Sequence, residues 1–262
     1  MNLLLVLIIS ILPVFLIGLY IYKKDINKEP GKLLRKLFRY GILICIPAAL
    51  VEIGIEYFFG DPEQMRYTEL FVYVLLDVAL VEELFKWIVV YLMTYKHNDF
   101  DELYDAIVYA VFVSLGFACF ENLFYVLASG VGVGLVRAVT AIPGHAADAI
   151  IMGNFLGLAK LADINNNRPL FIKNITLSLV MPVLAHTAYD FCLYTENLSF
   201  VGIFILFIIF LYVYSIKKIK RVSKNNKSLI KKEITLPPDV KYCPFCGTLS
   251  SGEYCHKCGT KL

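Results

Sequence analysis

Residues 3–22 read LLLVLIISILPVFLIGLYIY and contain no charged side chain. A helix rises about 1.5 Å per residue, so an apolar run of this length reaches across the roughly 30 Å hydrocarbon core of a bilayer. A second uncharged run, LSFVGIFILFIIFLYVYSI, occupies residues 198–216. These two runs predict a membrane protein.

The composition of the whole chain agrees with that prediction. Of the 262 residues, 58% are apolar and 18% are charged, whereas soluble domains average about 45–50% and about 25%. This excludes a typical soluble globular protein, and the apolar content also excludes a disordered chain.

Seven runs are long and apolar enough to span a bilayer: 3–22, 38–59, 68–95, 103–128, 135–159, 170–194 and 198–216. They are too long, and too evenly apolar, for the strands of a membrane barrel. A helix satisfies its own backbone hydrogen bonds in lipid. We therefore predict an all-α polytopic membrane protein with about seven transmembrane helices.

Positive charge is concentrated in two places. One group follows the first run and comprises Lys23, Lys24, Lys28, Lys32, Arg35 and Lys36; the other follows Ile216 and comprises Lys217, Lys218, Lys220 and Arg221. The positive-inside rule places both groups in the cytoplasm. We expect a multi-pass cell-membrane protein with its N-terminus outside and its C-terminus cytoplasmic. Because the basic residues follow the first run, that run does not have the pattern of a cleaved signal sequence.

The sequence divides into a transmembrane domain (1–216), a flexible basic linker (217–239) and a C-terminal module (240–262). The module holds two Cys-x-x-Cys pairs, each followed by glycine: Cys243 with Cys246, and Cys255 with Cys258. Four thiolates in this spacing predict a zinc ribbon with one structural Zn²⁺, and so short a module needs the metal to fold. Two disulfides are the alternative, disfavoured in a reducing cytoplasm. We expect the ribbon to bind a cytoplasmic protein or the tail of a substrate rather than nucleic acid, because its charge is modest.

Ionisable side chains at membrane depth mark the candidate site, because charge in lipid costs several kcal/mol. The middle runs contain Glu82, Glu83, Lys86, Glu121, His145, His186 and Asp190, and the first and last runs contain none. Glu82 and Lys86 are one helical turn apart, as are His186 and Asp190. Counted from the predicted outer ends of the runs, these groups lie at similar depths, so we expect them to form one site.

Five short motifs occur in order along the chain: Lys24-Asp25 with Glu29-Pro30; Glu82-Glu83-x-x-Lys86; Asp105 to Glu121-Asn122 with Gly116-Phe117; Pro143-Gly144-His145; and His186-x-x-x-Asp190. In this set the chain resembles the PrsW family of intramembrane proteases, which is related to the CAAX-prenyl endopeptidase and bacteriocin-processing group. It departs from that group by having Glu121 in place of a histidine and Asp190 in place of an asparagine. The resemblance implies cleavage of a membrane-anchored protein near its extracytoplasmic side. In the best-known members this substrate is an anti-sigma factor.

Two mechanisms are compatible with these residues. In the preferred one, Glu82 or Glu83 deprotonates a water with help from His145. His186, held by Asp190, then stabilises the oxyanion or protonates the leaving amine, while Lys86 balances charge and Glu121 positions the pair. In the alternative, His145 and His186 bind a catalytic zinc together with one carboxylate, which is Glu82, Glu121 or Asp190.

Two other classes of function remain open from the sequence. A proton-coupled transporter would also bury charge, although such proteins often carry inverted repeats, which we do not see here. A non-catalytic membrane scaffold would have the ribbon as its working part.

Overall fold

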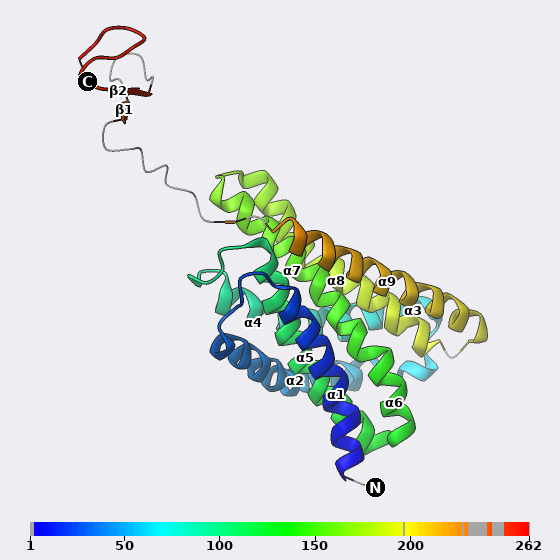
Figure 1. Cartoon of the computed structure of the whole chain (residues 1–262). Coiled ribbons are helices and arrows are strands. Elements are labelled where there is room, and N and C mark those ends of the chain that lie inside the picture. The colour runs from blue at the N-terminus through cyan, green and yellow to red at the C-terminus, as the bar shows by residue number, and fades with distance from the viewer. Residues whose placement is uncertain (1–2, 196, 227, 230–239, 243–248, 262) are drawn as a thin grey trace. The chain divides into compact units, whose positions relative to one another are not determined.

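The computed structural model describes residues 3–195, 197–226, 228–229, 240–242 and 249–261. The chain forms two compact units, residues 1–229 and 230–262. In its described part the first unit consists of helices and short connections (Figure 1). The prediction of an all-α polytopic membrane protein is confirmed at this level.

The first unit contains the helices α1 (Leu3–Lys24), α2 (Gly31–Phe59), α3 (Tyr67–Tyr73), α4 (Leu80–Thr94), α5 (Leu103–Ser129), α6 (Val131–Val139), α7 (Ala141–Ile164), α8 (Arg168–Tyr194) and α9 (Leu198–Lys224). A short 3₁₀ turn, η1 (Pro62–Gln64), precedes α3, and a π-helix, η2 (Val74–Ala79), joins α3 to α4. Among the described residues, six segments are long and apolar enough to cross a membrane: α1, α2, α5, α6 with α7, α8 and α9.

The remaining predicted span, residues 68–95, is the third in chain order and is not a single uninterrupted α-helix. It is helical throughout, but the π-helix η2 divides it into α3 and α4. Its second half carries Glu82, Glu83 and Lys86, which lower its hydropathy. Among the described residues, six segments therefore qualify as spans by length and composition alone, and residues 67–94 form a further helical segment that η2 interrupts.

Two predicted boundaries next to basic residues also differ from the structure. α2 begins at Gly31, so Lys32, Arg35 and Lys36 lie in its first turns rather than in a loop. α9 continues to Lys224, so residues 217–224, expected in a flexible linker, are helical. Lysine and arginine are good helix formers, and their long stems extend along apolar surface, so an apolar helix continues readily into a basic flank.

The predicted run 135–159 is divided at Thr140, where α6 ends and α7 begins. Pro143 is the third residue of α7, in the first turn, where the missing N–H removes no intrahelical hydrogen bond. The break comes before the Pro-Gly pair rather than at it, and it places His145 in the second turn of α7.

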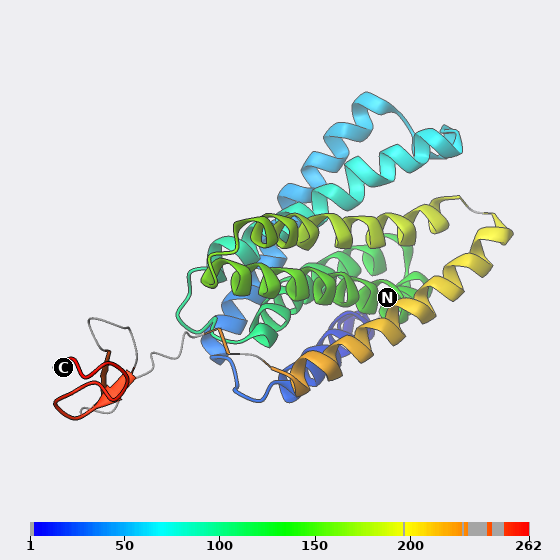
Figure 2. The same cartoon turned by 90° about the horizontal axis from the view of Figure 1, so that it is seen from above.

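α5 is the central helix of the first unit and packs against α1, α2 and α7. In its most apolar window 78% of the residues are buried, compared with 17% for α9. α9 runs along one side of this unit and the pair α2–α3 along the opposite side (Figure 2). The outer helices expose large apolar side chains such as Leu4, Leu50 and Leu206, as expected for surfaces that face lipid.

In the second unit, β1 (Val240–Tyr242) pairs antiparallel with β2 (Leu249–Ser251). Cys255 and Cys258 follow in a turn, where the Gly259 N–H donates to the Cys255 carbonyl at 2.8 Å and Gly259 has φ +73°. Cys243 and Cys246 lie outside the described residues, so the predicted zinc site stays a prediction.

Candidate active site

Two carboxylates and one ammonium group form the centre of the site. Glu82, Glu83 and Lys86 lie in the first two turns of α4, directly after the π-helix. The Lys86 Nζ donates to Glu82 Oε2 at 2.9 Å and to Glu83 Oε1 at 2.8 Å. All three side chains are buried, and Glu83 is 0% exposed. The spacing of three and four residues, which places these side chains on one face of a helix, therefore produces a buried ion-paired cluster.

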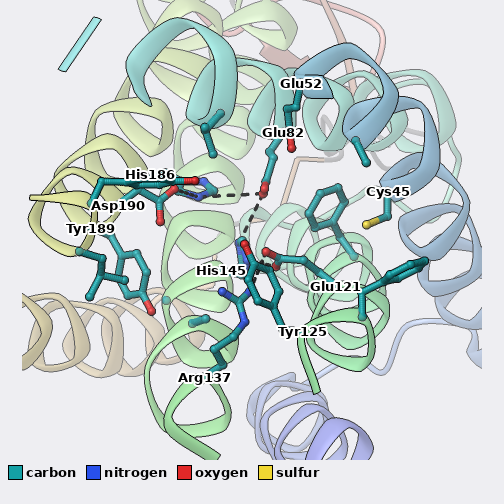
Figure 3. Close-up of a pocket in the computed structure, with 18 of the residues that line it drawn as sticks. Cys45, Glu52, Glu82, Glu121, Tyr125, Arg137, His145, His186, Tyr189 and Asp190 are labelled. Carbon is teal, nitrogen blue, oxygen red and sulfur yellow. Dashed lines mark hydrogen bonds and ion pairs between the residues drawn. The ribbon is translucent and has the colours of Figure 1, made fainter. Parts of the chain in front are cut away.

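Two histidines from other helices complete the cluster (Figure 3). His186, on α8, places Nδ1 3.0 Å from Glu83 Oε1 and Nε2 3.0 Å from Asp190 Oδ2. His145, on α7, places Nδ1 3.2 Å from Lys86 Nζ and Nε2 2.8 Å from Glu121 Oε2. The centroids of the two imidazole rings are 5.2 Å apart.

The two histidines share one arrangement. Each ring bonds through Nε2 to an outer carboxylate, Asp190 for His186 and Glu121 for His145, and directs Nδ1 toward the α4 cluster. A carboxylate on one ring nitrogen orients an imidazole whose other nitrogen binds a metal or a reacting group. Glu121 and Asp190 thus lie where they can orient the histidines.

Arg137, on α6, is a site residue that the sequence analysis missed. Its Nη2 lies 2.6 Å from Glu121 Oε1, and its guanidinium lies over the Tyr125 ring at 3.7 Å from the centroid. Its position inside the apolar run 135–159 was the signal that it is buried against a partner.

The cluster faces a cavity of about 1060 Å³. Glu82, Glu121, His145, His186 and Asp190 line it on one side. From α2, Cys45, Ala49 and Glu52 also line the cavity, and so does Asp148, one turn after His145 on α7. Ligand cavities in proteins are typically about 300–1,000 Å³, so this one is large enough for several residues of an extended peptide.

All seven residues singled out from the sequence therefore meet at one place. Glu82, Glu83, Lys86, Glu121, His145, His186 and Asp190 come from four helices, α4, α5, α7 and α8. The expected convergence is observed, whereas the catalytic role of each residue stays a prediction.

The donor atoms of the cluster fit a metal ion. One atom from each of Glu82, Glu83, His145 and His186 lies within 4.8 Å of the others, and histidine with carboxylate is a common ligand set of catalytic zinc. The Lys86 ammonium lies among these donors, so it must move aside when a metal binds there.

Comparison with known proteins identifies the family. Residues 29–215 match the sequence profile described as PrsW family intramembrane metalloprotease. The chain belongs to the PrsW family of intramembrane proteases. The protease PrsW of Oceanobacillus iheyensis is 37% identical over 184 residues, which cover 70% of this chain and 80% of that protein. The protease PrsW of Bacillus subtilis is 36% identical over 175 residues, covering 66% and 76% respectively.

The PrsW match includes all seven site residues but not residues 216–262. The chain is therefore an intramembrane protease with the buried cluster inside the family region, and the C-terminal module lies outside it. No solved structure matches the chain significantly.

Proposed function

We propose that this protein is a metal-dependent endopeptidase in which His145, His186 and at least one of Glu82 and Glu83 hold the metal. The observation that carries this is the paired arrangement of the histidines, each oriented by an outer carboxylate and turned toward the two α4 carboxylates. The proposal replaces our preference for a metal-free glutamate mechanism. The donor set and the family description both support the change.

A metal held there would supply Lewis-acid catalysis for hydrolysis of the peptide bond. The α4 carboxylate that is not a ligand acts as general base and takes a proton from the attacking water. Asp190 and Glu121 hold the two imidazole rings in place through Nε2. Arg137 in turn holds Glu121 through an ion pair, which keeps this carboxylate directed at His145. Burial of the cluster excludes bulk water and strengthens these electrostatic interactions.

The metal-free glutamate mechanism remains the second candidate because of one observation. The Lys86 ammonium already contacts Glu82, Glu83 and His145 at 2.9, 2.8 and 3.2 Å. A cation of the chain itself thus lies where a metal would compensate the carboxylates. In that mechanism Glu82 or Glu83 activates the water and His186 stabilises the oxyanion.

Metal content and cleavage, measured on the same variants, separate these candidates. We expect His186→Ala to lose one metal ion per chain and to lose cleavage. The control is His97→Ala, which changes an exposed residue in the connection between α4 and α5 and should keep both the metal and cleavage. A zinc ion in the C-terminal module is common to all variants and cancels in the comparison. If His186→Ala loses cleavage with an unchanged metal content, the metal-free mechanism holds. If both His186→Ala and Glu83→Gln keep cleavage, the site assignment is wrong.

We further propose, from the family resemblance, that the substrate is a membrane-anchored regulator such as an anti-sigma factor, cut near its extracytoplasmic side. The test compares the N-termini of membrane-protein fragments in cells that carry the wild-type protein or Glu83→Gln. We expect fragments that begin near the outer end of a span in the wild type only. Fragments that begin only in cytoplasmic segments would contradict the proposed side.

For residues 240–262 we propose a structural Zn²⁺ bound by Cys243, Cys246, Cys255 and Cys258, and a cytoplasmic protein as partner. The turn from Cys255 to Gly259 supports the metal. There the Gly259 N–H donates a hydrogen bond to the Cys255 carbonyl, and residue 259 has a positive φ, which glycine adopts readily.

A further inference from the structure

A second group of carboxylates lies outside the active site, where the α1–α2 connection meets the start of α5. Asp25 belongs to the connection, Glu102 is the N-cap residue of α5, and Asp105 lies in the first turn of α5. One carboxylate oxygen from each lies within 4.8 Å of the others. Asp25, from the α1–α2 connection, thus meets two acidic groups from the start of α5.

Two of these carboxylates each keep one buried oxygen without a hydrogen-bond partner. Asp25 is 3% exposed and Asp105 is 0% exposed. Asp25 Oδ2 accepts the Glu29 N–H at 3.3 Å, and Asp105 Oδ2 accepts the N–H groups of Asp101 and Glu102 at 3.0 and 2.6 Å. Neither Oδ1 atom has a partner among the described residues. A buried acceptor without a partner costs about 1–3 kcal/mol, and more when it is charged, so these oxygens point to a missing ligand.

The negative charge here also lacks a compensating cation. The Lys28 Nζ donates to the backbone carbonyls of Tyr22 and Asp25 rather than to the carboxylates. The described lysine and arginine side chains form no ion pair with Asp25, Glu102 or Asp105 in the part of the chain that the structure covers. Burial raises the pKa of Asp25 and raises that of the neighbouring Glu29 to about 7. The charged form of these carboxyl groups is therefore costly here without a cation.

We propose that Asp25, Glu102 and Asp105 bind a divalent cation, Ca²⁺ or Mg²⁺. A donor set made only of oxygen atoms suits these hard cations rather than zinc or copper. The cation would use the two Oδ1 atoms and would fasten the α1–α2 connection to the start of α5.

The end of the first unit converges on the same place. Asn226 Nδ2 donates to Glu102 Oε2, and the Leu229 N–H donates to the Asp101 carbonyl at 2.5 Å. A cation at this point would therefore stabilise three segments of the fold at once, and a ligand that binds only the folded state raises its stability. The inference is independent of the proposed protease mechanism, because none of these residues lines the active-site cavity.

Thermal unfolding of the full chain in detergent, after removal of divalent ions with chelator, tests the proposal. CaCl₂, MgCl₂ and KCl are added at equal ionic strength to the wild type, Asp25→Asn, Asp105→Asn and the control Asp99→Asn. Asp99 lies near the same end of the unit and interacts with His97 at 3.5 Å. We expect a saturable rise in Tm with Ca²⁺ or Mg²⁺ in the wild type and in the control. We expect the apparent affinity to fall at least about tenfold in each of the other two variants.

Terbium luminescence provides a second measurement that does not depend on unfolding. Tb³⁺ substitutes for Ca²⁺, and we expect Tyr109, whose hydroxyl donates to the neighbouring Glu29, to sensitise it. We expect emission from the wild type that Ca²⁺ or Mg²⁺ displaces, and its loss in Asp105→Asn. A rise in Tm that is the same in all four proteins, and the same with KCl as with the divalent salts, would overturn the proposal. Terbium emission that persists at the wild-type level in Asp25→Asn and Asp105→Asn would also overturn it.

Discussion

Lys86 is the residue on which the two mechanisms differ most. It is 1% exposed, and its ammonium contacts both α4 carboxylates as well as His145. It also lies 4.2 Å from the centroid of the Phe117 ring. In the metal-free mechanism this ammonium is the permanent counter-ion of the site. In the metal-dependent mechanism it competes with the metal for the same carboxylates.

We expect Lys86→Met to bind Zn²⁺ at least about tenfold more tightly than the wild type, if the site is a metal centre, because the competing ammonium is gone. Without metal, the variant buries two carboxylates that have lost their partner, and its free energy of unfolding should fall by about 3–5 kcal/mol. Zinc titration followed by thermal unfolding measures both effects.

Lys160→Met is the matched control, because the Lys160 Nζ donates to the Tyr95 carbonyl and lies away from the site. Its zinc affinity should equal that of the wild type. A Lys86→Met variant that loses stability and does not regain it with zinc would instead support the metal-free mechanism.

The sequence predicted the titratable members of the site well, because charge at membrane depth is costly and therefore informative. It did not predict that Arg137 pairs with Glu121, since that contact depends on how α6 is rotated relative to α5. Asp25 and Asp105 stand in motifs noted from the sequence, but their grouping with Glu102 was not predicted, for a similar reason. Its members lie at the ends of segments, where acidic residues are common and carry little information on their own.

At the scale of elements, the crossing of α2 and α5 depends on two glycines. A Cβ added at Gly41 would lie 2.0 Å from the Val113 carbonyl oxygen, and one at Gly116 would lie 2.1 Å from the Phe38 carbonyl oxygen. Both clashes are with backbone atoms, which cannot rotate away. Small residues let membrane helices approach closely in this way, and this contact fixes α2 across the cavity from the catalytic cluster.

We therefore expect Gly41→Ala to lower the free energy of unfolding by about 1–3 kcal/mol, the usual cost of overpacking. The cleavage rate should also fall, because α2 lines the cavity. Gly54→Ala is the control on the same helix: its Cβ would meet nothing within 4 Å. Thermal unfolding and cleavage of one reporter substrate measure both variants. Equal losses in Gly41→Ala and Gly54→Ala would show that helix propensity, not the crossing, is responsible.

Hydropathy predicted the lengths of most spans, but it did not predict where the helices are interrupted. The run 103–128 became α5 (Leu103–Ser129) almost without change. The run 68–95 instead contains a π-helix directly before Glu82 and Glu83. A π-turn adds a residue to the turn and is frequent at functional sites, but it leaves the apolar pattern nearly intact. The sequence therefore predicted a long span, but it did not predict the irregular backbone that positions the carboxylates.

At the scale of the whole molecule, the orientation in the membrane is still an inference from charge. The basic flanks after α1 and at the end of α9 predict that both are cytoplasmic. We expect a C-terminal fluorescent reporter to be active in the cytoplasm. We also expect an alkaline phosphatase fusion in the α2–α3 connection, near Asp61, to be active outside. The reverse pattern would contradict both the orientation and the proposed side of cleavage.

The C-terminal unit is the last part of the molecule whose role can be tested separately. Residues 230–262 form a compact unit apart from residues 1–229, and they lie beyond the region that matches the PrsW family. If the module holds a structural zinc, its folding depends on the metal and the folding of the helical unit does not.

We therefore expect the double variant Cys255→Ser with Cys258→Ser to lose one zinc ion per chain. Residues 240–262 should become sensitive to added protease, while the Tm of the helical unit and the rate of cleavage in detergent stay at wild-type values. Cleavage of the natural substrate in cells should fall, because there the module would bring a partner to the enzyme. Ser250→Ala, in the same hairpin, is the control and should keep its zinc. A double variant that keeps its metal content would contradict the zinc assignment. One that loses activity in detergent as well would show that the module belongs to the catalytic unit.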